Sequence, residues 1–117
     1  MDLRTAVQIH TDWKIRFRAT IQKQERIDSL AIGREDCCEF GTWLNGEGKA
    51  HFGSLPHFGA CATAHVLFHQ EAGKVAAAIN GRNYAGAEAM LALGSSYSSA
   101  SNGVTQAIMR LFKEIGS

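Results

Sequence analysis

Apolar residues recur at intervals of three and four along the first thirty residues of the chain. From Leu3 to about Leu30 the apolar stripe consists of Ala6, Ile9, Trp13, Phe17 and Ile21. Residues spaced in this way lie on one face of an α-helix, whereas a half-buried β-strand shows strict alternation. The pattern therefore predicts one long amphipathic helix, and the glycine of the segment AIGRED, residues 31–36, interrupts the pattern after it.

A second long stripe begins just after the single proline, Pro56. Proline is favoured in the first turn of a helix, and Ser54 is a candidate N-cap residue in front of it. The apolar face of this helix consists of Phe58, Cys61, Ala62, His65, Phe68, His69, Ala72, Val75, Ala76 and Ile79. We expect the helix to stop at Asn80 and Gly81, because both residue types are common at helix C-termini.

The last segment keeps the same spacing almost to the end of the chain. Its stripe consists of Tyr84, Ala87, Leu91, Gly94, Tyr97, Ser101, Val104, Ile108, Leu111 and Ile115. Residues 94–103, GSSYSSASNG, have the composition of a linker, but the stripe continues through them. We therefore predict one long helix that is irregular at this point and whose small residues allow a close neighbour.

A short helix is predicted within residues 37–49, CCEFGTWLNGEGK. Asp36 is a plausible N-cap, and Gly46 and Gly48 close the helix after two or three turns. Strand patterns are absent. Three long helices and a short one that carries Cys38 predict an all-α, antiparallel four-helix-bundle-like domain. The length of 117 residues fits a single domain covering 1–117.

The composition narrows the class of protein further. Twelve basic and eleven acidic residues leave a net charge of +1, and neither sign forms a block, so we expect no nucleic-acid partner. No apolar run approaches the ~20 residues that cross a bilayer, and the N-terminus is too polar for a signal peptide. We expect a cytoplasmic domain without membrane contact. Three cysteines, two of them adjacent, disfavour a disulfide framework.

The segment HVLFH places His65 and His69 four residues apart. In a helix these side chains project from the same face and can reach one ion. The pair alone is weak evidence, because two core-edge histidines bonded to backbone or solvent would give the same pattern.

Two further residues complete a possible metal site. His10 lies on the inward side of the first helix, although a lone histidine there is more often structural. Cys38 begins the short helix, where unpaired amides favour its thiolate, although a free cysteine is usually a small buried hydrophobe. Three imidazoles and one thiolate form a full tetrahedral set for zinc, or for copper in another geometry, but not for calcium or magnesium. His51 and His57 are expected to be solvated loop residues.

Three ordered blocks of sequence resemble a known family. They are His10-x-x-Trp13-Lys14, Cys38-Glu-Phe-Gly-x-Trp43-Leu44 followed by Gly46, Gly48 and Lys49, and His65-x-x-Phe68-His69. Together, from about Leu3 to Leu111, they resemble the chemoreceptor zinc-binding domain of bacterial chemoreceptors and diguanylate cyclases. The resemblance implies a helical bundle that acts as a homodimer.

The resemblance also implies a ligand set and a role. The family's zinc site of three histidines and one cysteine falls on His10, Cys38, His65 and His69. Members are sensors of zinc, or of oxidants such as hypochlorous acid through the ligand cysteine. We therefore predict a regulatory sensor that transmits zinc or oxidant status to a signalling module, in chemotaxis or cyclic-di-GMP output, in the same or a partner chain.

Cys37 is the visible departure from the family's pattern. Consecutive helical side chains point about 100° apart, so Cys37 and Cys38 are not expected to bind one ion as its normal pair. Cys38 is the predicted ligand because it stands in the Cys-x-Phe-Gly-x-Trp frame. Both are redox candidates, and Cys37 is an alternate ligand, a resolving thiol or a residue without a role.

Other side chains are expected to support the site. The aromatic residues expected to wall it are Trp13, Phe17, Phe40, Trp43 and Phe68. Metal-bound imidazoles usually donate their second N–H to a carboxylate or carbonyl. The carboxylates near enough in sequence are those of Asp12, Asp36, Glu39 and Glu71.

Two other functions compete with the sensor. A hemerythrin-like di-iron, oxygen-binding bundle would need bridging carboxylates and more histidines than are placed here. A purely structural, zinc-stapled dimerisation domain would hold its ion permanently. We predict no enzymatic activity, because four protein ligands leave no open position on the ion and no nucleophile or general base accompanies them.

Overall fold

The computed structural model describes residues 1–116, without the side chain of Cys37. Within that range the chain forms seven α-helices and one 3₁₀ turn and contains no strand, which confirms the all-helical prediction. The long helices are α1 (Leu3–Lys23), α5 (Pro56–Asn80) and α7 (Ser96–Ile115). The short elements are α2 (Ser29–Ile32), η1 (Glu35–Cys37), α3 (Glu39–Asn45), α4 (Glu47–Phe52) and α6 (Tyr84–Met90).

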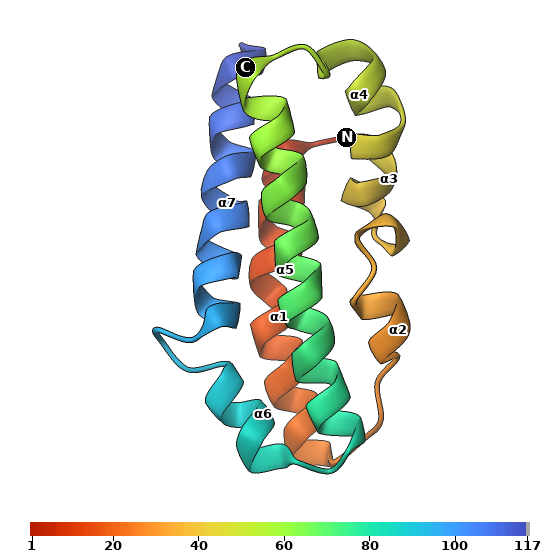
Figure 1. The fold of residues 1–117 in the computed structure, drawn as a ribbon, viewed down its shortest axis with the longest axis vertical. Coiled ribbons are helices and arrows are strands. Elements are labelled where there is room, and N and C mark those ends of the chain that lie inside the picture. Colours follow the sequence, from red (N-terminus) through yellow and green to blue (C-terminus); the bar gives the residue numbers. More distant parts are fainter. Residues whose placement is uncertain (117) are drawn as a thin grey trace.

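The three long helices lie alongside one another and define the long axis of the molecule (Figure 1). α5 packs against both α7 and α1, and α1 also packs against α7. α1 and α5 run in one direction and α7 in the other, so both termini lie at the same end (Figure 1). The elements from α2 to α4 form a fourth, broken column that extends along α5.

The faces predicted to be apolar meet in one hydrophobic core. Phe17 of α1, Phe68 of α5 and Val104 of α7 are all fully buried. Each comes from the apolar stripe of its own helix, so burial of these stripes is what holds the long helices together. His10, His65 and His69 are buried in the same core, as is Tyr97, whose hydroxyl has no hydrogen-bond partner.

The first helix is shorter than predicted. It ends at Lys23, because Gln24 adopts a left-handed conformation with φ 54° and its N–H bonds back to the carbonyls of Ile21 and Thr20. The next residues do not return to helix until Asp28, whose side chain caps α2 by accepting the N–H of Ala31. Non-glycine residues rarely adopt this left-handed conformation, so the stop could not be predicted from the stripe alone.

The prediction of one long helix over residues 84–115 was wrong, because the segment forms two helices. The break lies between α6 and α7, where Gly94 has φ +83°. Ser95 then caps α7 by accepting the N–H of Ser98. Leu91 is fully buried just before the break, so the chain changes direction without leaving the core, and the apolar spacing gave no sign of the interruption.

The region before α5 also differs from the prediction. Gly46 ends the short helix as expected, but Gly48 lies inside a further helix, α4, where its missing side chain makes room for the ring of Trp43. Ser54 does not cap α5, because the N-cap position is Leu55 and has no side-chain hydrogen bond.

Glu114 near the end of α7 takes over this capping function. Its carboxylate accepts the backbone N–H of His57 at 2.9 Å and the ring Nδ1–H of the same residue at 2.8 Å. These bonds hold the pKa of Glu114 below its usual range. A carboxylate at a helix N-terminus is favourable because it satisfies an unpaired donor and meets the positive end of the helix dipole.

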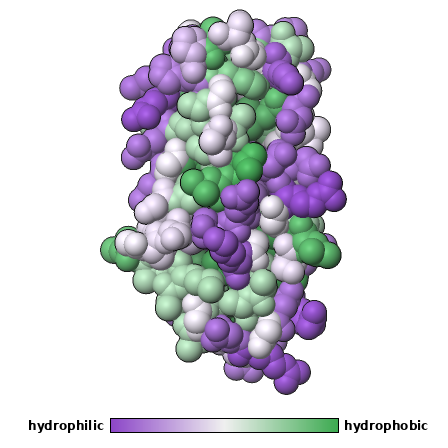
Figure 2. Space-filling view, in the orientation of Figure 1, coloured by the Kyte–Doolittle hydropathy of each residue, from purple (hydrophilic) through white to green (hydrophobic). Residues whose placement is uncertain are grey.

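Polar and apolar residues are interspersed on the face shown in Figure 2. The large apolar side chains most exposed to solvent come from separate elements, and include Ile15 of α1, Leu30 of α2 and Leu93 after α6. Over residues 1–116, no helix combines the length and the apolar character needed to cross a membrane.

We expect Glu114→Ala to lower the thermal midpoint of unfolding, because it removes the side chain that caps the start of α5. Glu88→Ala is the matched control, since Glu88 only forms an exposed ion pair with Arg18 at 3.6 Å. Circular dichroism melts of both variants measure the difference. Equal midpoints for the two variants would show that the bond between α7 and α5 contributes nothing.

Candidate metal centre

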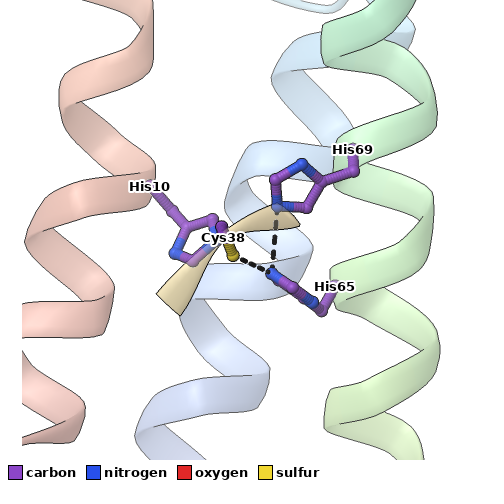
Figure 3. Close-up of side chains that lie close together, drawn as sticks. All are labelled: His10, Cys38, His65 and His69. Atoms are coloured by element: carbon purple, nitrogen blue, oxygen red, sulfur yellow. Dashed lines mark hydrogen bonds between the residues drawn. The ribbon is translucent and has the colours of Figure 1, made fainter. Parts of the chain in front are cut away.

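Four side chains from three separate elements converge on one point in the core. His10 comes from α1, Cys38 from the residue before α3, and His65 and His69 from α5 (Figure 3). One nitrogen or sulfur atom of each lies within 4.8 Å of the corresponding atom of the others. The structure therefore brings together all four residues that the sequence singled out.

Cys38 is held by the start of α3. It is the N-cap residue itself, and its Sγ accepts the backbone N–H of Gly41 at 3.3 Å. An unpaired amide and the positive end of a helix both favour a thiolate over a thiol. Asp36, the predicted N-cap, lies instead in η1, where its carboxylate binds Arg34.

Gly41 is required for this arrangement. A Cβ atom at position 41 would overlap the backbone carbonyl oxygen of Glu35 and would lie 3.1 Å from Cε1 of His65. Any larger residue would push α3 away from η1 and from the imidazole. The glycine of the Cys-x-Phe-Gly-x-Trp frame thus allows the sulfur-bearing turn to approach α5 closely.

Backbone carbonyls orient two of the three imidazole rings. Nδ1 of His10 lies 2.6 Å from the carbonyl oxygen of Ala6, and Nδ1 of His69 lies 2.8 Å from that of Ile32. A carbonyl can only accept, so Nδ1 carries the proton in both rings and Nε2 is left with a bare lone pair. The carboxylates suggested by sequence are not the partners of these two rings.

Nε2 of His65 is close to the donor atoms of two other residues of the cluster. Nε2 of His65 lies 3.0 Å from Nε2 of His69 and 3.2 Å from Sγ of Cys38. Nε2 of His10 is buried without a hydrogen-bond partner. Nδ1 of His65 is also buried without a partner, so no backbone carbonyl sets the tautomer of this ring, and the lone pairs of the cluster require a proton or a cation between them.

These separations suit a tetrahedral ion. Zinc bonds of about 2.0 Å to nitrogen and 2.3 Å to sulfur place neighbouring ligand atoms roughly 3.3 to 3.6 Å apart. The distances of 3.0 Å and 3.2 Å are close to these values. The donor set and its spacing therefore fit a zinc ion with four protein ligands.

Burial keeps the three imidazoles uncharged. Burial and, to a smaller extent, the neighbouring histidines lower the pKa of His10 to about 4, against the opposing effect of the bond to Ala6, and lower the pKa of His65 to about 3. Burial also lowers the pKa of His69, although the bond to Ile32 and the charge of Glu35 act in the opposite direction. At neutral pH all three rings are therefore in the form that binds a metal.

Two of the five predicted aromatic residues contact the imidazoles directly. The ring centroid of Phe40 lies 5.0 Å from that of His65, and the ring centroid of Phe68 lies 5.1 Å from that of His10. The other three form an outer layer, in which Trp43 stacks on Phe40 and Trp13 packs on Phe17. Phe40 and Phe68 are 1% and 0% exposed, so they exclude water from the cluster.

The other two histidines and Cys61 lie apart from the cluster. His51 and His57 are exposed, as expected, but they lie in α4 and at the start of α5 instead of in a loop. Cys61 is fully buried, and burial raises the pKa of its thiol to about 12, so it is an unreactive core residue. The side chain of Cys37, the second redox candidate, lies outside the described part of the structure.

Sequence reasoning did not identify the carbonyls of Ala6 and Ile32 as partners of the rings. Ala6 lies one helical turn before His10, so its carbonyl could have been proposed from the spacing. Ile32 lies 37 residues from His69, and only the packing of α2 on α5 brings them together.

We expect the metal-free protein to lose stability as the pH falls from about 6.5 to about 4. In this window the unfolded chain protonates the three histidines at their ordinary pKa of 6.5, whereas the folded chain does not protonate His10 or His65. The unfolded state then binds more protons, at a limiting cost of about 1.4 kcal/mol per pH unit for each histidine.

Urea unfolding of chelator-treated protein across this pH range measures the loss. His51→Gln is the control, because it removes an exposed histidine and is expected to leave the pH dependence unchanged. A stability that stays constant across the window would contradict the burial of neutral rings.

Comparison with known proteins agrees with this geometry. The family model described as "Chemoreceptor zinc-binding domain" matches residues 10–76, more than half of the chain. That range contains all four residues of the cluster, although it is shorter than the predicted resemblance from Leu3 to Leu111. No curated protein and no solved structure matches the chain. The chain belongs to the chemoreceptor zinc-binding domain family, whose members bind zinc.

Proposed function

We propose that His10, Cys38, His65 and His69 are the ligands of one zinc ion in a regulatory sensor domain. The observation that carries this proposal is the convergence of one nitrogen or sulfur atom of each residue to within 4.8 Å of the others in the core, where Nε2 of His10 lacks a hydrogen-bond partner. The membership of a zinc-binding family supports the choice of metal. We further propose that residues 1–117 form one such domain.

The ion would join elements that are distant in sequence. Bound zinc supplies a charge that all four donors share, and the free energy of binding then becomes free energy of folding for the contacts among α1, α3 and α5. His10 and His69 are already held in the required tautomer. Four protein ligands leave no position for a substrate, so we propose a regulatory role without catalysis.

Cys38 is the ligand that an oxidant can reach. It is half-buried, whereas the three imidazoles are buried. In the reaction with hypochlorous acid, the thiolate sulfur loses two electrons and gains oxygen to become a sulfenic acid, and the chlorine leaves as chloride. The sulfenic acid is a poorer ligand. Oxidation would therefore weaken the hold on zinc and release the start of α3.

The output of such a sensor lies beyond the zinc site itself. We propose that the domain acts in the cytoplasm as a homodimer with an antiparallel four-helix-bundle-like fold. Its zinc or oxidant status would pass to a signalling module for chemotaxis or cyclic-di-GMP output, in the same or a partner chain. The di-iron alternative fits less well, because the cluster contains a thiolate and no carboxylate.

We expect purified protein to contain one zinc ion per chain, and Cys38→Ala and His65→Ala to lose it. Each variant removes one of four donors, which leaves the ion with an incomplete tetrahedron. Cys61→Ala and His51→Ala are the matched controls, because they remove the same residue types outside the cluster. Elemental analysis measures the zinc, and unchanged zinc content in Cys38→Ala would overturn the proposal.

We also expect hypochlorous acid to release zinc, because it oxidises the sulfur ligand. A chromophoric chelator measures the rate of release, and Cys61→Ala should release zinc as fast as the natural sequence. Cys37→Ala tests whether the neighbouring cysteine acts as a resolving thiol. If it does, a reductant added after oxidation should restore zinc binding less well in this variant. A permanent structural staple would instead keep its zinc under the same treatment and in competition titrations.

A further inference from the structure

The single-turn helix α2 is attached to α5 at three successive places. Starting from the end of α5, Asn80 contacts Ile27 and Gly73 contacts Gly33. The third contact joins His69 of α5 to Ile32 of α2. α2 therefore lies along α5 in the direction of the metal centre (Figure 1). The third attachment is made by one of the proposed zinc ligands.

The first attachment is a pair of hydrogen bonds at the end of α5. The side chain of Asn80 accepts the backbone N–H of Ile27 at 2.8 Å and donates to the carbonyl of Ile27 at 2.7 Å. Both groups are half-buried. This pair fixes the segment that enters α2 at a point about three turns away from His69.

The second attachment is a contact between two backbones. A Cβ atom at Gly73 would lie 2.8 Å from Cα of Gly33, which is closer than real Cβ atoms approach. Glycine at position 73 therefore allows the end of α2 to lie directly on α5. Gly33 directly follows Ile32, so this contact also sets the position of the Ile32 carbonyl.

The third attachment is the hydrogen bond from Nδ1–H of His69 to the Ile32 carbonyl, 2.8 Å long. The corresponding bond of His10 goes to Ala6 of its own helix and joins no separate element. His69 is therefore the imidazole through which the cluster is hydrogen-bonded to a separate short helix. Ile32 is the one buried residue of α2, whereas Leu30 is 82% exposed.

We propose that zinc binding and the docking of α2 on α5 are coupled through His69. This inference rests on the proposed zinc site. A metal on Nε2 draws electron density from the ring and makes Nδ1–H a better donor to Ile32, while the carbonyl makes Nε2 a better ligand. Each event therefore favours the other, as linkage requires. A helix of one turn is unstable by itself, so α2 depends on these contacts.

Asn80→Ala tests the coupling from the end that is remote from the cluster. We expect a zinc affinity lower by about fivefold or more in competition titrations, because undocked α2 no longer orients His69. Asn83→Ala is the matched control: Asn83 caps α6 through the N–H of Gly86 and does not bond to the α2 region. Its zinc affinity should equal that of the natural sequence.

Gly73→Ala tests the coupling from within the contact. We expect about a tenfold loss of zinc affinity or more, since the added methyl group displaces Ile32 from His69. Gly59→Ala is the control on the same helix, because a Cβ atom there meets nothing within 4 Å. If Gly73→Ala does not fold, Asn80→Ala still decides the question.

Amide hydrogen exchange gives a readout that does not depend on the variants. The N–H groups of Ile32 and Gly33 bond to the carbonyls of Asp28 and Ser29 inside α2. We expect zinc to slow their exchange. Natural-sequence protein that binds no zinc would refute the proposed function. Protein that binds zinc while both variants keep full affinity, or while α2 exchanges at an unchanged rate, would refute only the coupling.

Discussion

The burial of three uncharged imidazoles around one point is the constraint on which the rest of the structure depends. In a medium of low polarity, lone pairs that face one another repel unless a proton or cation lies between them. The surrounding chain must therefore hold α1, α5 and the start of α3 in a fixed relation. Gly41 serves this purpose directly, because it lets the start of α3 approach η1 and His65 of α5 where a side chain would prevent it, and Gly73 does the same for the contact between the end of α2 and α5.

The molecule divides its stabilising interactions between two sides of α5. On one side, the cluster of His10, Cys38, His65 and His69 brings α5 together with α1 and the start of α3. On the other side, α7 packs through apolar contacts. The ring centroid of Tyr97 lies 5.7 Å from that of Phe68 and 5.9 Å from that of Phe17. Phe68 contacts both sides, since its ring also lies against His10. Changes at the metal centre and changes in the packing of α7 therefore share one fully buried side chain.

Most of the fold could be predicted from the local spacing of apolar residues. The errors in the predicted helix ends and caps have local causes. Gln24 ends α1 and Gly94 separates α6 from α7, and both adopt positive φ angles that the spacing of apolar residues does not reveal. Asp36 and Ser54 were reasonable caps by residue type. Instead, Cys38 caps α3 and Glu114 caps α5, because the surrounding structure places their acceptor atoms at the starts of these helices.

The sequence by itself indicated the apolar face of each long helix and singled out four candidate metal ligands. Helical periodicity put His10, His65 and His69 on inward faces, and the Cys-x-Phe-Gly-x-Trp frame selected Cys38. Only the tertiary structure decided how those donors are oriented, because the carbonyl of Ile32 reaches His69 across 37 residues of chain. The spacing of apolar residues describes one helix at a time. The tautomer of a buried imidazole depends instead on the backbone group that packs against it, and that group can belong to another element.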